Sequence, residues 1–590
     1  MLWREKRNNM ATYTLAKNGE SIYHIVNHRY SDETVRFAAS ELQKYILKAT
    51  NTVIPYFSDD ARCPKRGPEI LIGPFVRGET GWEDDLHEEG FIIRSQGENI
   101  AITGKTSRGV LYGVYRFLEI FCNYRCFTKD IESIDKMEEL TIELEEIREE
   151  PSFDFRDAYF RNAFDGGFAS KNHLNSSLSD ISKARGGRRK WFNFHHSFLN
   201  LIPDEVYFEK HPEWFSEIGG ERKRNTQLCL TNEALVDEAE KNLRKWIEEN
   251  PECKVFSVAQ NDNEEFCTCE KCRALEEIEG SHSGPIIHFV NKLADRIKED
   301  YPDVMIHTFA YWYSMEAPKY VVAKDNVIVR LCTTSCCHQK PFEELAEQNP
   351  GGIEYRYVNA LKNWKTHAKN VYIWDYIVNF RNYLQPFVTF ETLQKNLAFY
   401  KECGVLGVLE QGNFAYGGGG CFDDMKSYII SRLLWNYKTD IHHEIHRFCM
   451  GVYGEKAGEY MEEYTYLAQA LCSSGELSIY QAPDAGYITD EYVEEADRLV
   501  SKAIEVAENE VYRRNAEKEY LSVRFLKLTR MELGVAGREE AIEKFFDDVK
   551  GHGITEIRER RTLEVTKYNI LKNRYAKGGE GEYTLYYIMQ

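Results

Sequence analysis

Residues 404–420 read GVLGVLEQGNFAYGGGG. An apolar run ends at the acidic residue Glu410, and a glycine-rich segment follows at once. A short, continuous apolar run bounded by turn residues is typical of a strand that is buried on both faces, as in a parallel sheet. The stretch therefore predicts a parallel strand that ends at a carboxylate.

The same pattern recurs from residue 152 to residue 438, where strand-like and helix-like segments alternate. Amphipathic helical segments such as EALVDEAEKNLRKWIEE, PIIHFVNKLADRIKED, FETLQKNLAFYKEC and MKSYIISRLLWNY follow the later strands. A (β/α)₈ barrel takes about 250 residues, which fits this part of the chain. A doubly wound sheet would place phosphate-binding glycines after its first strand, where none stand. Eight segments read as strands: FDFRDAYF, WFNFHHSF, TQLCL, KVFSVAQND, MIHTFAYWY, VIVRLC, VYIWDYIV and GVLGVLEQG.

Two further regions flank the predicted barrel. Residues 1–150 alternate helical stretches with the short strands EILIG, FIIRS and NIAITG, which predicts a small α+β domain. Residues 441–590 are polar with helical periodicity, as in YVEEADRLVSKAIEVAE, which predicts an α-helical domain. We therefore predict an α/β protein with a (β/α)₈ TIM barrel at 151–440, an α+β N-terminal domain and a helical C-terminal domain.

Charge and cysteine content limit the partners and the compartment. The formal net charge is −20, which repels nucleic-acid backbones and anionic membranes, so we expect neither as a partner. The first residues, MLWREKRNNMATYTLA, lack the apolar stretch of a secretory signal, and no apolar run is long enough to span a membrane. Fifteen scattered cysteines fit a reducing compartment. These features predict a cytoplasmic protein.

Polar and aromatic side chains gather where the predicted strands end. In barrel enzymes the catalytic groups lie at the carboxyl ends of the strands, because the loops there form the open mouth. The residues at these ends are His196, Gln260, Asn261, Asp262, Glu264, Glu265, Tyr311, Trp312, Trp374, Asp375, Tyr376, Glu410 and Asn413. Carboxylates, carboxamides and aromatic rings are therefore expected to meet at one mouth.

This mixture of side chains suits a carbohydrate. Aromatic rings cover the apolar faces of sugars, and carboxamides and carboxylates bind their hydroxyl groups. Cleavage of a glycosidic bond needs two carboxyl groups, one that protonates the leaving oxygen and one that stabilises or attacks the oxocarbenium-like centre. Strands four and eight lie opposite each other in an eight-stranded barrel, so Glu410 and an acid among Asp262, Glu264 and Glu265 are positioned to bracket one bond. The glycines at 417–420 suggest a flexible loop that covers the substrate.

The cysteines after the fourth predicted strand suggest a second kind of site. Cys267, Cys269 and Cys272 have the close spacing of a zinc knuckle. A fourth ligand is available two strands later, among Cys332, Cys336, Cys337 and His338. The alternative is that these residues are packed or free thiols near the mouth.

Several motifs resemble one family. FSVAQNDN followed by CTCEKCRALEEIEGSHSG, together with HHSFLNLIP, HPEWF, QLCLTN and GVLEQGN, is similar to a group of bacterial proteins classed as a domain of unknown function, whose characterised relatives are family 163 glycoside hydrolases. Those relatives are endo-β-N-acetylglucosaminidases. The segment TGKTSRGVLYGVYRFLE resembles the N-terminal domain that precedes the barrel in α-glucuronidases and β-hexosaminidases. The two resemblances together span about 20–435.

The resemblance implies a retaining barrel glycosidase with carboxylates as acid/base and nucleophile. Glu410 matches a family carboxylate and is the expected nucleophile, and the acid/base is Glu265, Glu264 or Asp262. In an alternative mechanism the acetamido group of the substrate is the nucleophile, and Glu410 or Asp262 orients it. The resemblance also implies sugar binding by His196, Gln260, Asn261, Trp374, Asp375 and Tyr376.

We therefore expect a glycoside hydrolase that cleaves a β-linked oligosaccharide containing N-acetylhexosamine, with no cofactor required for catalysis. The family's known hydrolases act outside the cytoplasm, whereas this chain shows no export signal, so an imported, short oligosaccharide is an alternative substrate. Further alternatives are an α-glucuronidase-like exo-hydrolase, a carbohydrate-binding protein on a degenerate barrel, and a metal-dependent hydrolase that uses the cysteine cluster.

Overall fold

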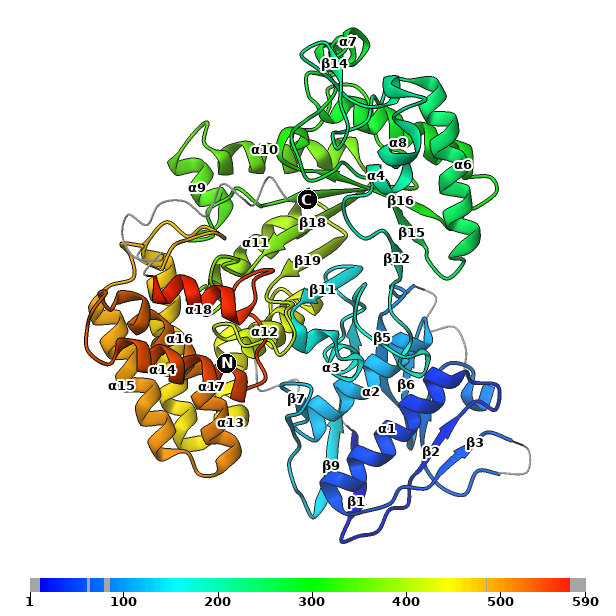
Figure 1. The fold of residues 1–590 in the computed structure, drawn as a ribbon. Coiled ribbons are helices and arrows are strands. Elements are labelled where there is room, and N and C mark those ends of the chain that lie inside the picture. The colour runs from blue at the N-terminus through cyan, green and yellow to red at the C-terminus, as the bar shows by residue number, and fades with distance from the viewer. Residues whose placement is uncertain (1–10, 61–63, 79–84, 484, 573–590) are drawn as a thin grey trace.

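The computed structural model describes residues 11–60, 64–78, 85–483 and 485–572. Three regions follow one another along the chain: an N-terminal α/β region, a curled parallel sheet with helices around it, and a helical C-terminal region (Figure 1). The predicted fold class is confirmed, and the structure corrects its details.

The N-terminal region is a mixed six-stranded sheet covered by two helices. The helix α1 (Glu33–Thr50) begins where the Asp32 side chain accepts a hydrogen bond from the Val35 N–H, and α2 (Ser107–Phe121) begins in the same way at Thr106. The predicted strands FIIRS and NIAITG form β5 and β6, which pair antiparallel. The strand order is β10 (Ile147–Glu149), β5 (Phe91–Gln96), β6 (Asn99–Gly104), β4 (Glu69–Ile72), β2 (His24–Asn27) and β3 (Tyr56–Ser58), with β1 (Ala11–Lys17) and β9 (Glu139–Leu144) as a separate pair and β7 (Arg125–Cys126) and β8 (Glu132–Ser133) as another.

The central region is a parallel sheet of seven strands within the described residues. The strand order is β11 (Phe155–Tyr159), β19 (Gly407–Gln411), β18 (Asn370–Tyr376), β17 (Val327–Cys332), β16 (Met305–Ala310), β15 (Val255–Ser257) and β12 (Trp191–Phe192). No pairing joins β11 to β12, so the sheet curls without closing among these residues. The barrel is therefore open along one side.

The eighth predicted strand, TQLCL, is absent from this sheet. Its Leu228 forms only an isolated bridge with Phe215, beside the short hairpin of β13 (Glu217–Ile218) and β14 (Glu221–Arg222). The side chain of Gln227 in this segment binds the backbone of Asn261 and Asn263 instead, which explains why the segment follows the loop after β15 and not the sheet. The prediction of eight strands was therefore wrong for TQLCL, and the other seven predicted segments form the sheet. Three strands, β18, β17 and β16, separate β19 from β15.

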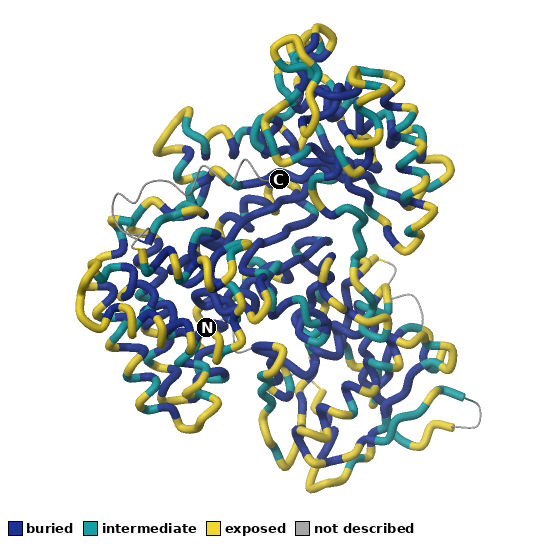
Figure 2. The backbone as a smooth tube through the Cα atoms, in the orientation of Figure 1, coloured by how far each residue is buried: buried dark blue, intermediate teal, exposed yellow. Residues whose placement is uncertain are grey.

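Helices cover the outer face of the curled sheet. The predicted amphipathic segments form α6, α8, α11 and α12, and the strands beneath them are buried, dark blue in Figure 2. The helices of this region are α3 (Gly166–Lys171), α4 (Phe198–Leu201), α5 (Asp204–Tyr207), α6 (Glu233–Glu249), α7 (Glu270–Glu279), α8 (Ser283–Ile297), α9 (Phe342–Gln348), α10 (Ile353–His367), α11 (Phe390–Glu402) and α12 (Asp423–Trp435).

The C-terminal region is helical, as predicted. Two of its loops reach the carboxyl ends of the barrel strands: Phe380, after β18, donates its N–H to the carbonyl of Ile479 and accepts one from Glu559. The helices are α13 (Ile441–Tyr453), α14 (Glu455–Ser474), α15 (Asp490–Val506), α16 (Glu510–Arg530), α17 (Arg538–Gly551) and α18 (Leu563–Leu571). No helix in the described ranges is long and apolar enough to cross a membrane.

The glycine-rich segment at 417–420 is docked against this C-terminal region. Gly417, Gly418 and Gly419 have φ angles of 83°, 60° and 91°, which side-chain-bearing residues rarely adopt. A Cβ atom on Gly417 would lie 1.9 Å from the carbonyl oxygen of Gly553. The glycines are needed for this close backbone contact, and the predicted role of the segment as a flexible cover stays a prediction.

Candidate active site

The inner face of the curled sheet is lined by aromatic rings. Trp374 on β18 lies 5.4 Å from Phe194 and 5.8 Å from Phe309 between ring centroids, and its Nε1 donates to Gln411 Oε1 at 2.7 Å. Tyr159 at the end of β11 lies 6.5 Å from Trp374. These rings pack against one another and make much of the barrel interior apolar.

Asp262 lies at the carboxyl end of this interior. Tyr311 donates its hydroxyl to Asp262 Oδ1 at 3.0 Å, and His196 Nε2 lies 3.6 Å from the same oxygen. The side chain of Asp262 keeps 39% of its surface exposed, which leaves it accessible to a ligand. The structure therefore brings two other predicted residues, Tyr311 and His196, to the carboxylate of Asp262.

His196 is oriented by the backbone. Its Nδ1 lies 2.7 Å from the Gln260 carbonyl oxygen and donates to it, which turns Nε2 toward Asp262. Burial lowers the pKa of His196 from its usual value, and the charge of Asp262 opposes this shift. The imidazole is therefore mostly neutral at neutral pH.

The predicted carboxamides hold the loop in place. Gln260 is fully buried, donates to the Tyr311 carbonyl and accepts from the Ser314 hydroxyl. Asn261 accepts from the Leu199 N–H at 3.2 Å and donates to the Thr226 carbonyl at 2.8 Å. Both side chains are therefore occupied by the protein and position Asp262.

Trp312 has a strained backbone next to this carboxylate. Its φ angle is 49°, which is uncommon for a bulky residue, and its ring stacks on Tyr311 at 4.7 Å. It borders a cavity of about 230 Å³ at the carboxyl ends of β16 and β17. Other lining residues are Glu264, Tyr313, Cys332, Thr334 and Arg356. This volume lies below the ~300–1,000 Å³ of pockets that enclose a drug-sized ligand. Asp262 is not among the residues that line the cavity.

Glu559 is a second carboxylate at the mouth, which the sequence interpretation missed. It lies in the loop between α17 and α18, where its N–H donates to the Phe380 carbonyl at 3.0 Å. Burial raises the pKa of Glu559 to about 7, the charge of Arg560 lowers it, and the charge of Asp262 raises it. The segment around it, ITEIRERRT, reads as a charged interhelical loop and gives no signal that it reaches the barrel.

Glu410, by contrast, lies away from the mouth. It pairs in register with Asp375, so both side chains project from the same face of the sheet. Asp375 accepts from Tyr400 of α11 at 2.8 Å and from Thr333 at 2.6 Å, which places this face against the helices. Glu410 is fully buried, and neither carboxyl oxygen has a hydrogen-bond partner in the described part of the chain.

The remaining predicted residues lie in three places: the barrel interior, the glycine-rich segment and the loop after Asp262. Tyr376 is buried and accepts from Thr334 at 3.1 Å near the interior. Asn413 is fully buried and donates to Asp423 at 2.9 Å, so it supports the glycine-rich segment. Glu265 is exposed on the loop after Asp262, and its N–H donates to Asn263. Of the predicted carboxylates, Asp262 lies beside Tyr311 and His196, and Glu264 lines the cavity next to Trp312.

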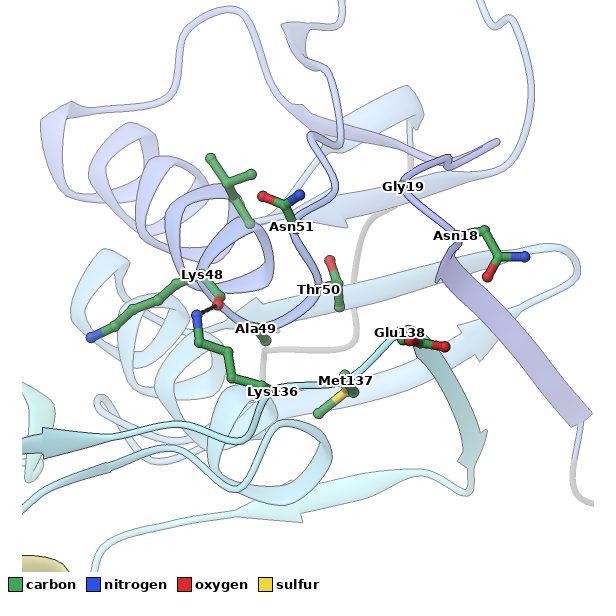
Figure 3. A pocket seen from close by; sticks show the side chains of 10 residues that line it. Asn18, Gly19, Lys48, Ala49, Thr50, Asn51, Lys136, Met137 and Glu138 are labelled. Carbon is green, nitrogen blue, oxygen red and sulfur yellow. Dashed lines mark hydrogen bonds between the residues drawn. The ribbon is translucent and has the colours of Figure 1, made fainter.

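A wider depression of about 780 Å³ lies in the N-terminal region, at the end of α1 (Figure 3). Its lining includes one carboxylate, Glu138, and Lys136 reaches back to the carbonyl oxygen of Lys48. A single carboxylate cannot supply both an acid and a base or nucleophile. The barrel mouth is therefore the better candidate for chemistry.

Two family models match different parts of the chain. Residues 126–466, more than half of the chain, match the family described as Domain of unknown function (DUF4838). The chain belongs to this family. The DUF4838 match covers the curled sheet together with its helices, and residues 9–117 match the Glycosyl hydrolase family 67 N-terminus. The resemblance to a domain of unknown function and to a glucuronidase N-terminal domain is confirmed.

Solved structures similar to this DUF4838 chain are carbohydrate-active enzymes. A family 115 4-O-methyl-α-glucuronidase with specificity for decorated arabinogalactans aligns over 95% of this chain and 78% of its own, with a TM-score of 0.57 and 9% identity. A family 138 enzyme that targets pectin rhamnogalacturonan II aligns over 93% of this chain and 74% of its own, with a TM-score of 0.48 and 11% identity. A chitobiase from Flavobacterium johnsoniae aligns over 91% of this chain and 94% of its own, with a TM-score of 0.44 and 12% identity. No curated protein matches the chain. The first likeness shows a glycoside-hydrolase-like fold.

Proposed function

We propose that this protein hydrolyses a β-linked oligosaccharide containing N-acetylhexosamine, and that the reaction takes place at Asp262. The observation that carries the proposal is the accessible Asp262 carboxylate, held by Tyr311 and faced by His196 at the carboxyl ends of the strands. The glycoside-hydrolase-like fold and the family 67 N-terminal match support it.

The two mouth carboxylates have different surroundings, which supports different roles. Glu559 keeps its proton up to a pH of about 7, so it is suited to protonate the leaving glycosidic oxygen. Asp262 is then the group that stabilises or attacks the developing oxocarbenium centre. With a covalent intermediate at Asp262 the reaction retains the anomeric configuration.

The neighbours of Asp262 also support an N-acetylated sugar. An acetamido group presents one N–H donor and one carbonyl acceptor. Asp262 Oδ1 accepts from the Tyr311 hydroxyl at 3.0 Å, which leaves Oδ2 of the same carboxylate to accept the acetamido N–H. In that arrangement the substrate's own acetamido oxygen is the nucleophile and Asp262 orients it. Activity on N-acetylglucosaminides but not on the matched glucosides would favour this substrate-assisted route.

A panel of aryl glycosides tests the proposal, with β-N-acetylglucosaminides, β-glucosides and α-glucuronides as its arms. Asp262→Asn should lower kcat by about 10³-fold or more, and Glu559→Gln by about 10²–10⁴-fold. The Glu559→Gln loss should shrink with activated leaving groups, which need no proton. In the wild type, kcat/KM should fall as the pH rises through about 7, since Glu559 then loses its proton.

Glu410→Gln and Glu265→Gln are the matched controls and should retain near wild-type kcat/KM. Loss of activity in Glu410→Gln with Asp262→Asn active would restore the assignment made from the sequence alone. Activity on α-glucuronides alone would support the exo-glucuronidase alternative. Sugar binding by calorimetry without turnover of any arm would support a carbohydrate-binding protein.

A further inference from the structure

Four cysteine side chains meet on the loop side of β15. Cys229 lies within TQLCL, the segment predicted as a strand, Cys267 and Cys269 lie in the loop after β15, and Cys272 is in the first turn of α7. All four are buried, and their Sγ atoms lie within 4.8 Å of one another. They form a cluster of their own, separate from the main apolar core.

The sulfur spacing matches a tetrahedral metal site. Cys229 Sγ lies 3.7 Å from Cys269 Sγ and 3.9 Å from Cys272 Sγ. In a tetrahedral zinc site with Zn–S bonds of about 2.3 Å, the sulfur atoms are about 3.8 Å apart. The four cysteines are free thiols in this structure. The distances therefore fit four thiolates around one ion.

The surroundings supply the hydrogen bonds and the positive charge that such thiolates need. The Glu217 N–H and the Arg222 guanidinium donate to Cys267 Sγ at 3.3 Å and 3.5 Å, and Thr231 Oγ1 lies 3.2 Å from Cys272 Sγ. Cys269 is the N-terminal cap of α7, where the helix dipole favours negative charge. Four thiolates with Zn²⁺ carry two negative charges, which these donors partly offset.

We propose that Cys229, Cys267, Cys269 and Cys272 bind one Zn²⁺ ion in a structural site. Four cysteine ligands fill the tetrahedral positions and leave none for water or substrate, as in known structural zinc sites. This assignment corrects the fourth ligand expected from the sequence. Cys332, Cys336, Cys337 and His338 are not among the clustered ligands, and Cys337 instead accepts the Leu477 N–H.

The ion would join two segments that have little secondary structure. Thr268 donates its N–H and its hydroxyl to the Glu217 carbonyl, and the Gln227 N–H donates to the Glu265 carbonyl. Figure 1 shows β14 and α7 side by side at the top of the molecule, and much of this part is exposed in Figure 2. The zinc site therefore clamps the loop that carries Asp262.

Metal analysis of the full chain tests the site directly. The protein purified under reducing conditions without chelator should contain about one zinc per chain. After removal of the zinc, Co²⁺ added alone should give the intense thiolate-to-cobalt charge-transfer and d–d absorption of a tetrahedral tetrathiolate site. Zinc content well below one per chain, together with no such absorption, would overturn the proposal, as would iron in place of zinc.

Variants test the ligand set. Cys229→Ser should lose most of the zinc, and Cys269→His should retain it, because histidine is also a zinc ligand and this variant guards against simple misfolding. Cys253→Ser, a buried cysteine outside the cluster, is the matched control and should keep a full complement. Loss of zinc in Cys337→Ser with full zinc in Cys229→Ser would contradict this assignment.

The consequence for the Asp262 loop rests on the proposed function, but the metal test does not. Zinc removal should increase hydrogen exchange of residues 259–272 several-fold and lower kcat/KM, with little change in the exchange of β17 and β18. Zinc binding in a protein that hydrolyses no glycoside would reject the function and keep the site. Glycoside hydrolysis by a protein that is purified without zinc and gives no Co²⁺ absorption would keep the function and reject the site.

Discussion

At the scale of single residues, Glu410 shows how one apolar strand can carry a charge-bearing group without exposing it. The side chain is fully buried, and burial raises its pKa well above the usual value, with the charge of Asp375 raising it further. Burial therefore favours the protonated, neutral form of this carboxyl group. Its burial without a hydrogen-bond partner in the described residues costs stability and is not offset by an ion pair.

Glu410→Gln should therefore change the pH dependence of stability. A folded-state pKa above the unfolded value contributes stability below the unfolded pKa, and this contribution is lost as the pH rises toward the folded pKa. The slope of the unfolding free energy against pH should become less negative, by up to about 1.4 kcal/mol per pH unit for one proton. Urea denaturation from pH 5 to pH 9 measures it. Glu265→Gln, on the exposed loop, should leave the slope unchanged, and equal slopes for wild type and Glu410→Gln would refute the prediction.

At the scale of the elements, the sequence predicted the strands and helices that depend on local apolar patterns. The apolar runs gave seven of the eight strands correctly, and the periodicity of EALVDEAEKNLRKWIEE matches α6 residue for residue. TQLCL failed because Gln227 binds the neighbouring loop, a contact that no local pattern encodes. Which face of β19 Glu410 occupies depends on the register with β18, and Glu559 reaches the mouth only through tertiary packing. Strand ends alone therefore indicated that Asp262 and Tyr311 lie close together, but not that Glu559 comes near Asp262 or that Cys229 joins the other three cysteines.

The contact between the glycine-rich segment and the loop before α18 is testable by substitution. Gly417→Ala places a Cβ atom 1.9 Å from the Gly553 carbonyl oxygen at a φ angle of 83°. Gly187→Ala is the matched control, because its φ angle is 70° and nothing lies within 4 Å of the new Cβ. The control should cost about 1–2 kcal/mol for the backbone conformation alone, and Gly417→Ala clearly more.

Thermal unfolding of both alanine variants measures the difference. Because Glu559 lies on the loop that Gly417 contacts through Gly553 and Ile554, Gly417→Ala should also lower kcat/KM more than Gly187→Ala does. Equal destabilisation of the two variants would show that the loop moves aside freely and that the segment is not a fixed support.

At the scale of the whole molecule, α12 joins the barrel to the N-terminal region. Arg432 of α12 forms two hydrogen bonds with Glu119 at the end of α2, at 2.6 Å and 2.9 Å, and both side chains are buried. Trp435, the last residue of α12, donates its indole N–H to the Glu149 carboxylate at 3.1 Å. The chain returns to the N-terminal region after the barrel is complete, so the two regions are expected to unfold together.

Glu119→Gln should make the N-terminal region and the barrel unfold separately. Burial alone would raise the pKa of Glu119, but the charges of Arg432 and Arg125 hold it well below the usual range. A lowered pKa contributes stability above the unfolded value of about 4.3, and this stability is lost as the pH falls. At pH 7 the variant leaves Arg432 buried without its partner, which costs about 3–5 kcal/mol. The wild type should lose this extra stability as the pH falls, so the free energies of unfolding of the two proteins should become similar toward pH 3.

Differential scanning calorimetry across pH 3 to pH 8 measures both effects. We expect one transition in the wild type at pH 7 and two in Glu119→Gln, the first from the N-terminal region. Glu505→Gln removes a partner from an exposed pair with Lys502, at 2.9 Å, and should leave the transition temperatures nearly unchanged. A single, unshifted transition in Glu119→Gln would mean that the buried pair does not couple the two regions, and that the contacts of Trp435 suffice.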